Sequence, residues 1–164
     1  MRVYGVTGWK NSGKTTLMER LVAEITRRGF SVSTLKHAHH GFDVDQPGKD
    51  SHRHRMAGAR QVLGASGARW ARMTELGGGA EPPLAALLAR LDPVDLVLVE
   101  GYKRDAHPKV EAFRAATGNT LIAADDPTVR AIAADVDLPG QQLPVFDLDD
   151  TTGVAAFILR DLGL

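Results

Sequence analysis

The chain has 164 residues, of which 43% are hydrophobic and 24% charged, a composition typical of a globular domain. Its 20 basic and 20 acidic residues balance, so no net field attracts nucleic acid or an anionic membrane. The absence of cysteine excludes disulfides and thiolate metal sites. No apolar stretch is long enough to cross a bilayer, and Met1-Arg2 leads directly into a strand rather than a signal peptide. We therefore expect a single cytoplasmic domain, residues 1–164.

The strongest motif follows the apolar run at residues 3–6. From Gly8 to Thr15 the sequence fits the phosphate-loop pattern G-x-x-x-x-G-K-[ST], placed between a strand and a helix. Glycines let backbone N–H groups surround a polyphosphate, and the N-terminus of the following helix favours the same anion. Lys14 would reach the β- and γ-phosphates, and the Thr15 hydroxyl would hold Mg²⁺. The expected nucleotide-binding residues of the loop are Gly8, Asn11, Ser12, Gly13, Lys14, Thr15 and Thr16.

Hydrophobic periodicity and turn signals predict the remaining elements of the first half. A helix follows the loop and ends at Gly29, which acts as its C-cap. The other elements expected are a strand at 30–37, a polar loop at 38–51, a helix capped by Asp50-Ser51 and running to about Ala59, two antiparallel strands at 61–63 and 68–73, and a helix at 83–91.

The second half continues the alternation of strands and helices. The run at 95–100 is almost purely apolar, which is typical of a parallel strand covered on both faces. The other elements expected are strands at 109–113 and 120–124, a helix from Asp125-Asp126-Pro127 to Ala134, a strand at 145–146 and a helix at 151–162. With the phosphate loop, this order predicts a P-loop NTPase fold of the three-layer α/β/α type, whose mostly parallel sheet carries a short antiparallel extension.

Glu100 ends the buried strand, at the edge where ligands bind in open parallel sheets. A carboxylate there has the Walker B role and would orient the Mg²⁺ shell opposite the phosphate loop. We therefore expect Thr15 and Glu100 on the metal side, and Lys14 and Glu100 as the catalytic pair. Asp95 begins the same strand and should lie at its far end.

The stretch 36–45 holds an unusual density of histidine and aspartate. It follows the second strand, so it should leave the sheet at the edge of the phosphate loop. It is interpreted as a nucleotide-sensing segment, a phosphate clamp, a hydrogen-bonded polar loop, or a metal site in which His37 and His39 share one face and Asp43 or Asp45 completes the ligand set. The helix that follows carries Asp50, Ser51, Arg53 and Arg55, which either reach the phosphates or form a solvated face.

Recognition of the base is less well specified. A carboxylate reads guanine by accepting from N1–H and the 2-amino group, and Asp125 or Asp126 after the strand expected at 120–124 would suit this role. The Asn-Lys pair that usually precedes such an aspartate is replaced by Ala123-Ala124, and Asp126 equally suits a helix cap before Pro127. We assign Asp125 to the nucleotide site.

Several segments together resemble one family, molybdopterin-guanine dinucleotide biosynthesis protein B (MobB). The matching segments, in the family's order, are Gly8 to Thr16, Lys36-His37 to Ser51, Asp95 to Lys103 and Pro108-Lys109-Val110-Glu111. The resemblance implies a P-loop protein that binds GTP, hydrolyses it weakly with Mg²⁺, and assists the guanylyltransferase that attaches GMP to the molybdenum cofactor. It also implies contact with molybdopterin or the molybdenum cofactor, and a homodimer with an extended sheet, in which we expect the strands near 61–73 and 109–113 to build the contact.

Two other functions are compatible with a phosphate loop. One is a small-molecule kinase with Arg53 and Arg55 on a closing lid. The other is a metal-delivery GTPase that uses His37, His39 and His40, although such proteins typically use a cysteine, which this chain lacks.

Overall fold

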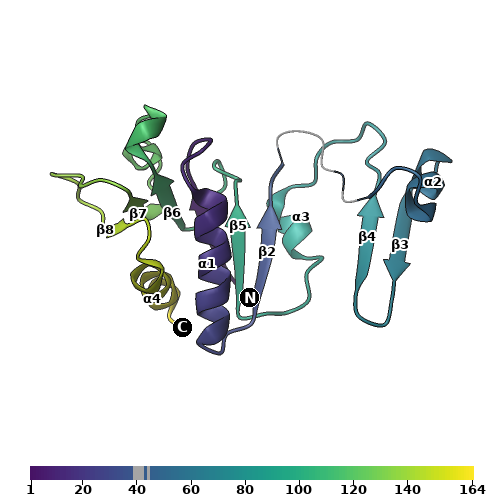
Figure 1. The fold of residues 1–164 in the computed structure, drawn as a ribbon, viewed down its shortest axis with the longest axis horizontal. Helices are drawn as coiled ribbons and strands as arrows, with labels where there is room; N and C mark the ends of the chain where they lie inside the picture. Colours follow the sequence, from purple (N-terminus) through teal and green to yellow (C-terminus); the bar gives the residue numbers. More distant parts are fainter. Residues whose placement is uncertain (39–42, 44) are drawn as a thin grey trace. The chain divides into compact units, whose positions relative to one another are not determined.

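The computed structural model describes residues 1–38, 43 and 45–164 (Figure 1). They form two compact units. The first contains Met1–His37 and Leu87–Leu164, and the second contains Ala38–Ala86. Each unit is described separately below.

The first unit is built on a six-stranded parallel sheet in the order β2-β5-β1-β6-β7-β8. β1 is central, between β5 and β6, so the phosphate loop leaves the middle of the sheet. The strands are β1 (Arg2–Thr7), β2 (Val32–Lys36), β5 (Leu96–Glu100), β6 (Lys109–Phe113), β7 (Val129–Ala134) and β8 (Val145–Asp147). This confirms the predicted α/β fold with a mostly parallel sheet.

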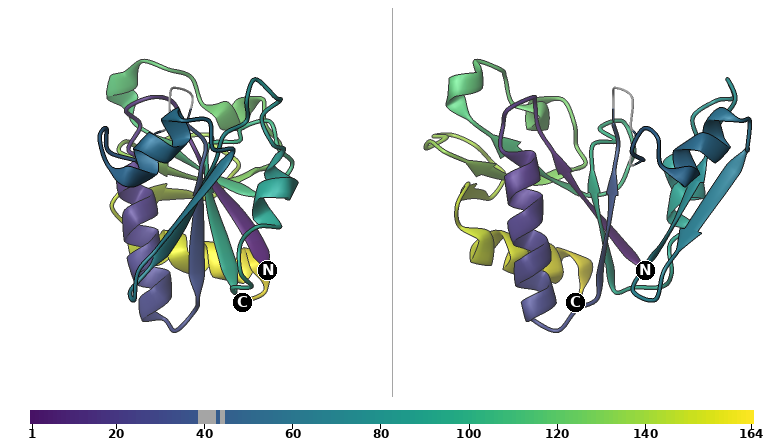
Figure 2. Two further views of the ribbon diagram at one scale, coloured as in Figure 1. Left: turned by 90° about the vertical axis from the view of Figure 1, so that its right-hand side faces the viewer. Right: turned by 45° about the vertical axis from the view of Figure 1, so that its right-hand side comes forward.

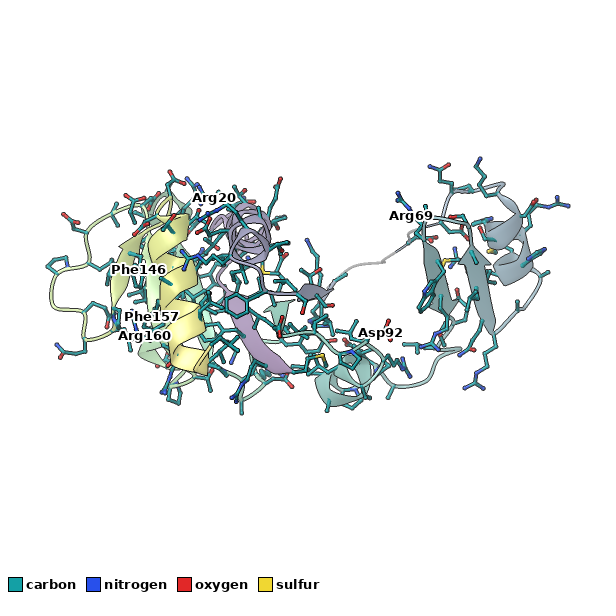
Figure 3. The ribbon with its side chains drawn as sticks, turned by 90° about the horizontal axis from the view of Figure 1, so that it is seen from below. Arg20, Arg69, Asp92, Phe146, Phe157 and Arg160 are labelled. Carbon is teal, nitrogen blue, oxygen red and sulfur yellow. The ribbon has the colours of Figure 1, made fainter. Side chains whose placement is uncertain are left out.

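Two amphipathic helices cover one face of this sheet, α1 (Lys14–Arg27) and α4 (Thr151–Leu162) (Figures 1 and 2). Their apolar sides form one core with alternate residues of β1, β5 and β6. In the middle of α4, Phe157 packs on Phe146 of β8 with ring centroids 5.6 Å apart (Figure 3). Both helices begin and end close to the residues predicted for them.

The second face of the sheet carries buried charge. On β6, Lys109 and Glu111 alternate with Val110 and Ala112, which belong to the apolar core, and both charged side chains are fully buried. The Lys109 ammonium donates to the carbonyls of Asp105 and His107, at 2.5 and 3.2 Å. These bonds fasten the chain after β5 to the sheet. Two short 3₁₀ helices, η1 (Ala115–Thr117) and η2 (Ile122–Ala124), follow β6, and η2 packs beside β7.

The region 120–134 differs from the prediction. Ile122–Ala124 form a 3₁₀ helix rather than a strand, and Val129–Ala134 form strand β7 rather than a helix. Alanine-rich sequence after Asp-Pro favours a helix locally. Here it pairs with β6 and β8, and alanines on both faces of β7 are buried, so tertiary packing overrides local propensity.

The prediction that residues 109–113 build a dimer contact is wrong. This segment is β6, which is hydrogen-bonded to β1 on one side and β7 on the other. A strand with both edges paired has no free backbone groups for a partner chain.

The second unit contains α2 (Asp50–Met56) and an antiparallel sheet of β3 (Gln61–Ala65) and β4 (Trp70–Thr74), as predicted. A short helix, α3 (Leu84–Leu88), begins within the last residues of this second unit. The residue before α2 is Lys49, and neither Asp50 nor Ser51 caps the helix. Ser51 instead donates its hydroxyl to the Asp45 carboxylate at 2.7 Å, because Asp45 lies close to the first turn of the helix.

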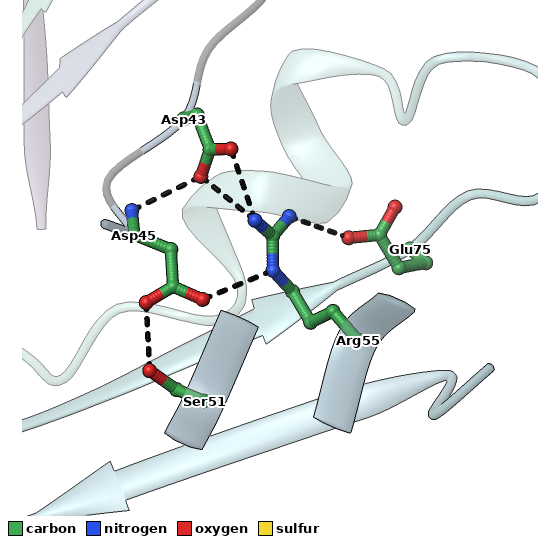
Figure 4. A network of polar contacts seen from close by, with 5 residues as sticks. All are labelled: Asp43, Asp45, Ser51, Arg55 and Glu75. Atoms are coloured by element: carbon green, nitrogen blue, oxygen red, sulfur yellow. Dashed lines mark hydrogen bonds and ion pairs between the residues drawn. The ribbon is translucent and has the colours of Figure 1, made fainter. Parts of the chain in front are cut away.

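Arg55 on α2 holds this unit together (Figure 4). Its guanidinium donates to three carboxylates, those of Asp43 at 2.9 Å, Asp45 at 3.2 Å and Glu75 at 2.8 Å. These contacts join the segment before α2, the helix itself and the residue that follows β4. The pKa of the Asp43 carboxyl lies below its ordinary range mainly because of the hydrogen bond from the Asp45 N–H, and that of Asp45 mainly because of the Ser51 hydroxyl; in both cases the Arg55 guanidinium lowers the pKa further.

Replacement of Arg55 by methionine is expected to weaken the acid response of the second unit. In the wild type the lowered carboxyl pKa values stabilise the fold above about pH 4, and this stabilisation is lost as the pH falls through them. Without the guanidinium one cause of the lowered pKa values is lost, while the hydrogen bonds from the Asp45 N–H and the Ser51 hydroxyl remain, so the variant loses less stability than the wild type on acidification. Hydrogen-exchange protection factors for β3 and β4, measured at pH 4 and pH 7, test this. Arg53→Met, at an exposed position of the same helix, should behave like wild type.

None of the helices within the described residues is long and apolar enough to cross a membrane.

Candidate nucleotide-binding site

The phosphate loop connects β1 to α1 in the conformation that its glycines require. Gly8 and Gly13 have φ values of 147° and 92°, in the region that disfavours side chains. A Cβ on Gly8 would also lie 2.4 Å from the Ala112 carbonyl oxygen and from the Ser12 hydroxyl oxygen. Gly13 directly precedes the first residue of α1, so the N–H groups of the first helical turn point into the loop.

Lys14 is the first residue of α1, and its ammonium donates to the Trp9 carbonyl at 2.6 Å. Burial lowers the pKa of Lys14, and the nearby Lys103 ammonium lowers it further. A partly desolvated cation near a second cation is stabilised by an incoming anion. The geometry therefore suits the predicted phosphate contact of Lys14.

Thr15 and Glu100 meet at the edge between β1 and β5. The Thr15 hydroxyl donates to Glu100 Oε1 at 3.1 Å, and the Lys36 ammonium lies 3.5 Å from Glu100 Oε2. Parallel pairing of β1 with β5 brings them together, since it places Val6 opposite Glu100. Glu100 is only 9% exposed. The structure thus brings together the two residues that were predicted separately for the metal side.

The pair fits Mg²⁺ by its chemistry. Both donors are oxygens, which Mg²⁺ prefers, and adjacent ligands of an octahedral ion with bonds of about 2.1 Å lie about 3 Å apart. The observed separation of 3.1 Å between Thr15 Oγ1 and Glu100 Oε1 matches this value.

A cavity of about 470 Å³ opens beside Trp9 of the phosphate loop. The Trp9 indole N–H donates to the Thr120 carbonyl at 2.8 Å, and the Lys103 ammonium lies 4.2 Å from the ring centroid. The cavity is lined by Trp9, Lys103, Arg104, Thr120, Leu121, Ile122, Asp125 and Asp126.

Asp125 follows η2 in this lining, and the strand on which its assignment as the base reader depended is absent. Asp126 does not cap a helix. Its Oδ1 accepts from the N–H of Thr128 at 2.9 Å and from the Thr128 hydroxyl at 2.5 Å.

Two residues near the loop were missed from the sequence. Arg114, directly after β6, has its Nε 3.2 Å from the position that a Cβ would take on Gly13. Glu111 accepts the N–H groups of Ile122 and Ala123, one on each carboxylate oxygen, both at 2.8 Å. Burial raises the pKa of Glu111. The position of Arg114 just after the carboxyl end of β6 was the available signal for that residue, whereas Glu111 lies in the middle of the strand and gave no such signal.

The predicted histidine site is described only in part. His37 packs on Tyr102 with ring centroids 4.6 Å apart. His39 and His40 lie outside the described residues. Asp43 and Asp45, which would have completed a metal site, pair with Arg55. Within residues 1–38, 43 and 45–164, no group of three or more histidines and carboxylates is placed to hold a metal ion.

The parallel sheet, the loop and the Thr15–Glu100 pair define the class of protein, a P-loop NTPase fold. The chain belongs to the family described as molybdopterin guanine dinucleotide synthesis protein B (MobB), which it matches over residues 3–135.

Individual relatives agree with this membership. The chain is 40% identical over 157 residues to the molybdopterin-guanine dinucleotide biosynthesis adapter protein of Escherichia coli K12, covering 93% of this chain and 88% of that protein. It is 44% identical over 110 residues to the adapter protein of Haemophilus influenzae, covering 67% and 62% of the two chains. The crystal structure of a MobB homolog from Bacillus stearothermophilus matches with a TM-score of 0.69 and 30% identity over 99% of both chains.

Proposed function

We propose that this chain is a GTP-binding adapter of molybdopterin guanine dinucleotide biosynthesis, which hydrolyses GTP slowly with Mg²⁺ and assists the guanylyltransferase. The observation that carries the proposal is the contact of Thr15 with Glu100 beside Lys14, because it assembles the phosphate and metal sides of one site. Family membership and the printed role of the relatives support the pathway.

The residues have separate tasks in this proposal. Lys14 exchanges the Trp9 carbonyl for phosphate oxygens, and the loop N–H groups hold the remaining phosphate charge. Mg²⁺, when bound, neutralises charge on the β- and γ-phosphates, and Thr15 and Glu100 would hold it. Both oxygens of Glu100 already have partners, Thr15 and Lys36, so this carboxylate orients groups rather than removing a proton. Hydrolysis without a free base is expected to be slow.

Equilibrium binding of GTP, ATP and GDP in the presence of Mg²⁺ tests the proposal. A clear preference for GTP supports it, and a preference for ATP, or none, overturns it. Acceleration of GTP hydrolysis by the purified guanylyltransferase, or a stable complex of the two in sedimentation, tests the adapter role.

Replacement of Glu100 by glutamine is expected to spare GTP affinity and to slow hydrolysis about tenfold or more, since the variant keeps the shape of the side chain but loses the charge that orients the metal shell. Single-turnover hydrolysis and binding titrations measure the two effects. Asp95→Asn, just before the opposite end of the same strand, is the matched control and should hydrolyse GTP at the wild-type rate. A Glu100→Gln variant as fast as wild type would remove Glu100 from the mechanism.

We also propose a homodimer formed through β3 and β4. Both strands carry large exposed apolar side chains, with Leu63 61% and Trp70 63% exposed. Sedimentation of Trp70→Ser against wild type tests this contact, and an unchanged dimer would exclude it.

The kinase alternative loses one of its two lid arginines, because Arg55 is occupied by three carboxylates of its own unit. The metal-delivery alternative loses Asp43 and Asp45 to the same network.

A further inference from the structure

Lys103 is a half-buried cation beside the phosphate loop, on the turn that follows β5. Its ammonium lies 4.2 Å from the ring centroid of Trp9, the second residue of the loop. Among the residues that the structure describes, this ammonium makes no hydrogen bond or ion pair. Burial lowers the pKa of Lys103, and the charge of the Glu111 carboxylate acts in the opposite direction. A desolvated ammonium without a contacting partner is stabilised by an anion that reaches it.

Three ammonium groups lie close together at the edge of the sheet beside Glu100. After burial, the strongest influence on the pKa of Lys14 is the charge of Lys103, which lowers it, and the charge of Lys36 lowers it further. Two of these three groups already have oxygen partners. Lys36 lies 3.5 Å from Glu100 Oε2, and Lys14 donates to a carbonyl of the loop. Lys103 is therefore the cation of this group that can bind a further anion without breaking a hydrogen bond.

The position of Lys103 along a bound polyphosphate follows from the loop. The N–H groups at the start of α1 surround the α- and β-phosphates, whereas Lys14 and the metal side formed by Thr15 and Glu100 face the β- and γ-phosphates. Lys103 follows Glu100 by three residues and packs on Trp9 at the beginning of the loop, so it lies on the second of these sides. The anion within its reach is the γ-phosphate, which GTP has and GDP lacks.

The turn that carries Lys103 is held in a defined conformation. Tyr102 has a φ of 48°, in the left-handed region that residues other than glycine seldom adopt. The N–H of Asp105 donates to the Tyr102 carbonyl at 3.1 Å and closes the turn. The buried Lys109 ammonium donates to the carbonyls of Asp105 and His107 and ties the end of the turn to β6. Backbone strain that surrounding contacts maintain is typical of functional segments, and here it fixes the point from which the Lys103 side chain extends.

We propose that Lys103 is the residue that distinguishes GTP from GDP: its ammonium leaves the Trp9 ring and donates to an oxygen of the γ-phosphate. This inference deepens the proposed function, because it rests on nucleotide binding at the phosphate loop and adds the contact that senses the third phosphate. The Trp9 ring then loses its cation when a triphosphate binds and keeps it when a diphosphate binds.

Replacement of Lys103 by methionine removes the charge and keeps the length of the side chain. We expect affinity for the non-hydrolysable β,γ-imido analogue of GTP to fall about tenfold or more, while affinity for GDP changes less than about threefold. Lys103→Arg restores the cation and should keep most of the preference for the triphosphate. Arg104→Met is the matched control, because Arg104 is exposed and lines the same cavity at Trp9. It should leave the ratio of the two affinities at the wild-type value.

Trp9 fluorescence gives a second readout that a general loss of structure does not produce. The chain has two tryptophans, so Trp70→Phe leaves Trp9 as the single reporter. An ammonium over the face of an indole perturbs its π-system. The triphosphate analogue should therefore change the Trp9 emission, and GDP should not. In the double variant Lys103→Met/Trp70→Phe, this difference between the two nucleotides should disappear.

Equal losses of affinity for the triphosphate and the diphosphate would show a general attraction for anions, and unchanged affinities would show no contact. Either result overturns the assignment of Lys103. A Trp9 signal that is absent, or that GDP produces as strongly as the triphosphate analogue, overturns the exchange between ring and phosphate.

The same titrations with the β,γ-imido analogue of ATP and with ADP separate this inference from the choice of base. If wild type prefers adenine nucleotides, the proposed GTP-binding adapter is overturned, while a loss confined to the triphosphate in Lys103→Met still supports the role of Lys103. Wild type that binds neither triphosphate overturns both.

Discussion

Replacement of Lys14 by alanine is expected to weaken GTP binding about 100-fold or more without unfolding the protein. A hydrogen bond to a charged group is worth up to about 3 kcal/mol, and a factor of ten in affinity corresponds to about 1.4 kcal/mol. The ammonium now donates to the Trp9 carbonyl, so nucleotide binding exchanges a neutral acceptor for a charged one. Isothermal titration with GTP and Mg²⁺ measures the change.

The free energy of unfolding of Lys14→Ala shows whether the variant has lost only nucleotide binding or also its folded structure. Burial lowers the pKa of Lys14 below its ordinary value. The charged side chain is therefore less stable in the folded state than in the unfolded state. Removal of the ammonium should leave the free energy of unfolding unchanged or slightly higher. Lys10→Ala removes the same charge from an exposed position of the same loop and should keep most of the affinity. Lys14→Ala with wild-type affinity would contradict the assignment of the site.

The parts of the fold that could be predicted are those in which local pattern and tertiary packing agree. The helix after the loop has its apolar residues at helical spacing and buries them, with Leu17, Leu21 and Ile25 fully covered. The apolar run of β5 predicted burial on both faces, and all five residues are buried. Position at a strand end was enough to place Glu100 beside the phosphate loop, where it contacts Thr15.

Residues 120–134 could not be predicted because their local signals oppose their packing. Val129–Ala134 satisfy helix propensity, but the chain places them between β6 and β8, where small side chains allow both faces to be covered. The error moved the expected strand end by ten residues, from Ala124 to Ala134.

Buried charge could not be predicted from the sequence either. A polar residue within a strand is usually exposed, and the alternation of Lys109 and Glu111 with apolar residues is typical of a half-solvated strand. Both are fully buried because carbonyls of the segment before β6 and N–H groups of the segment after it satisfy them. Such partners become visible only when the topology is known.

Replacement of Glu111 by glutamine is expected to destabilise the protein by about 2–3 kcal/mol, because the amide accepts one backbone N–H and turns its own donor toward the other. The two N–H groups belong to Ile122 and Ala123, so the variant loosens η2. Urea unfolding followed by circular dichroism measures the effect. Glu19→Gln, at an exposed position of α1, should change stability by less than about 0.5 kcal/mol.

The pH dependence gives this prediction a second, independent test. Burial is the largest influence on Glu111, and it raises the pKa of this carboxyl. A raised pKa in the folded state favours folding below about pH 4.5, and this contribution is lost as the pH rises through the folded value. Glutamine does not titrate, so the stability difference between wild type and Glu111→Gln should narrow as the pH rises from 4 to 8. A gap that widens over this range would mean that the two backbone N–H groups, rather than burial, dominate the ionisation of Glu111.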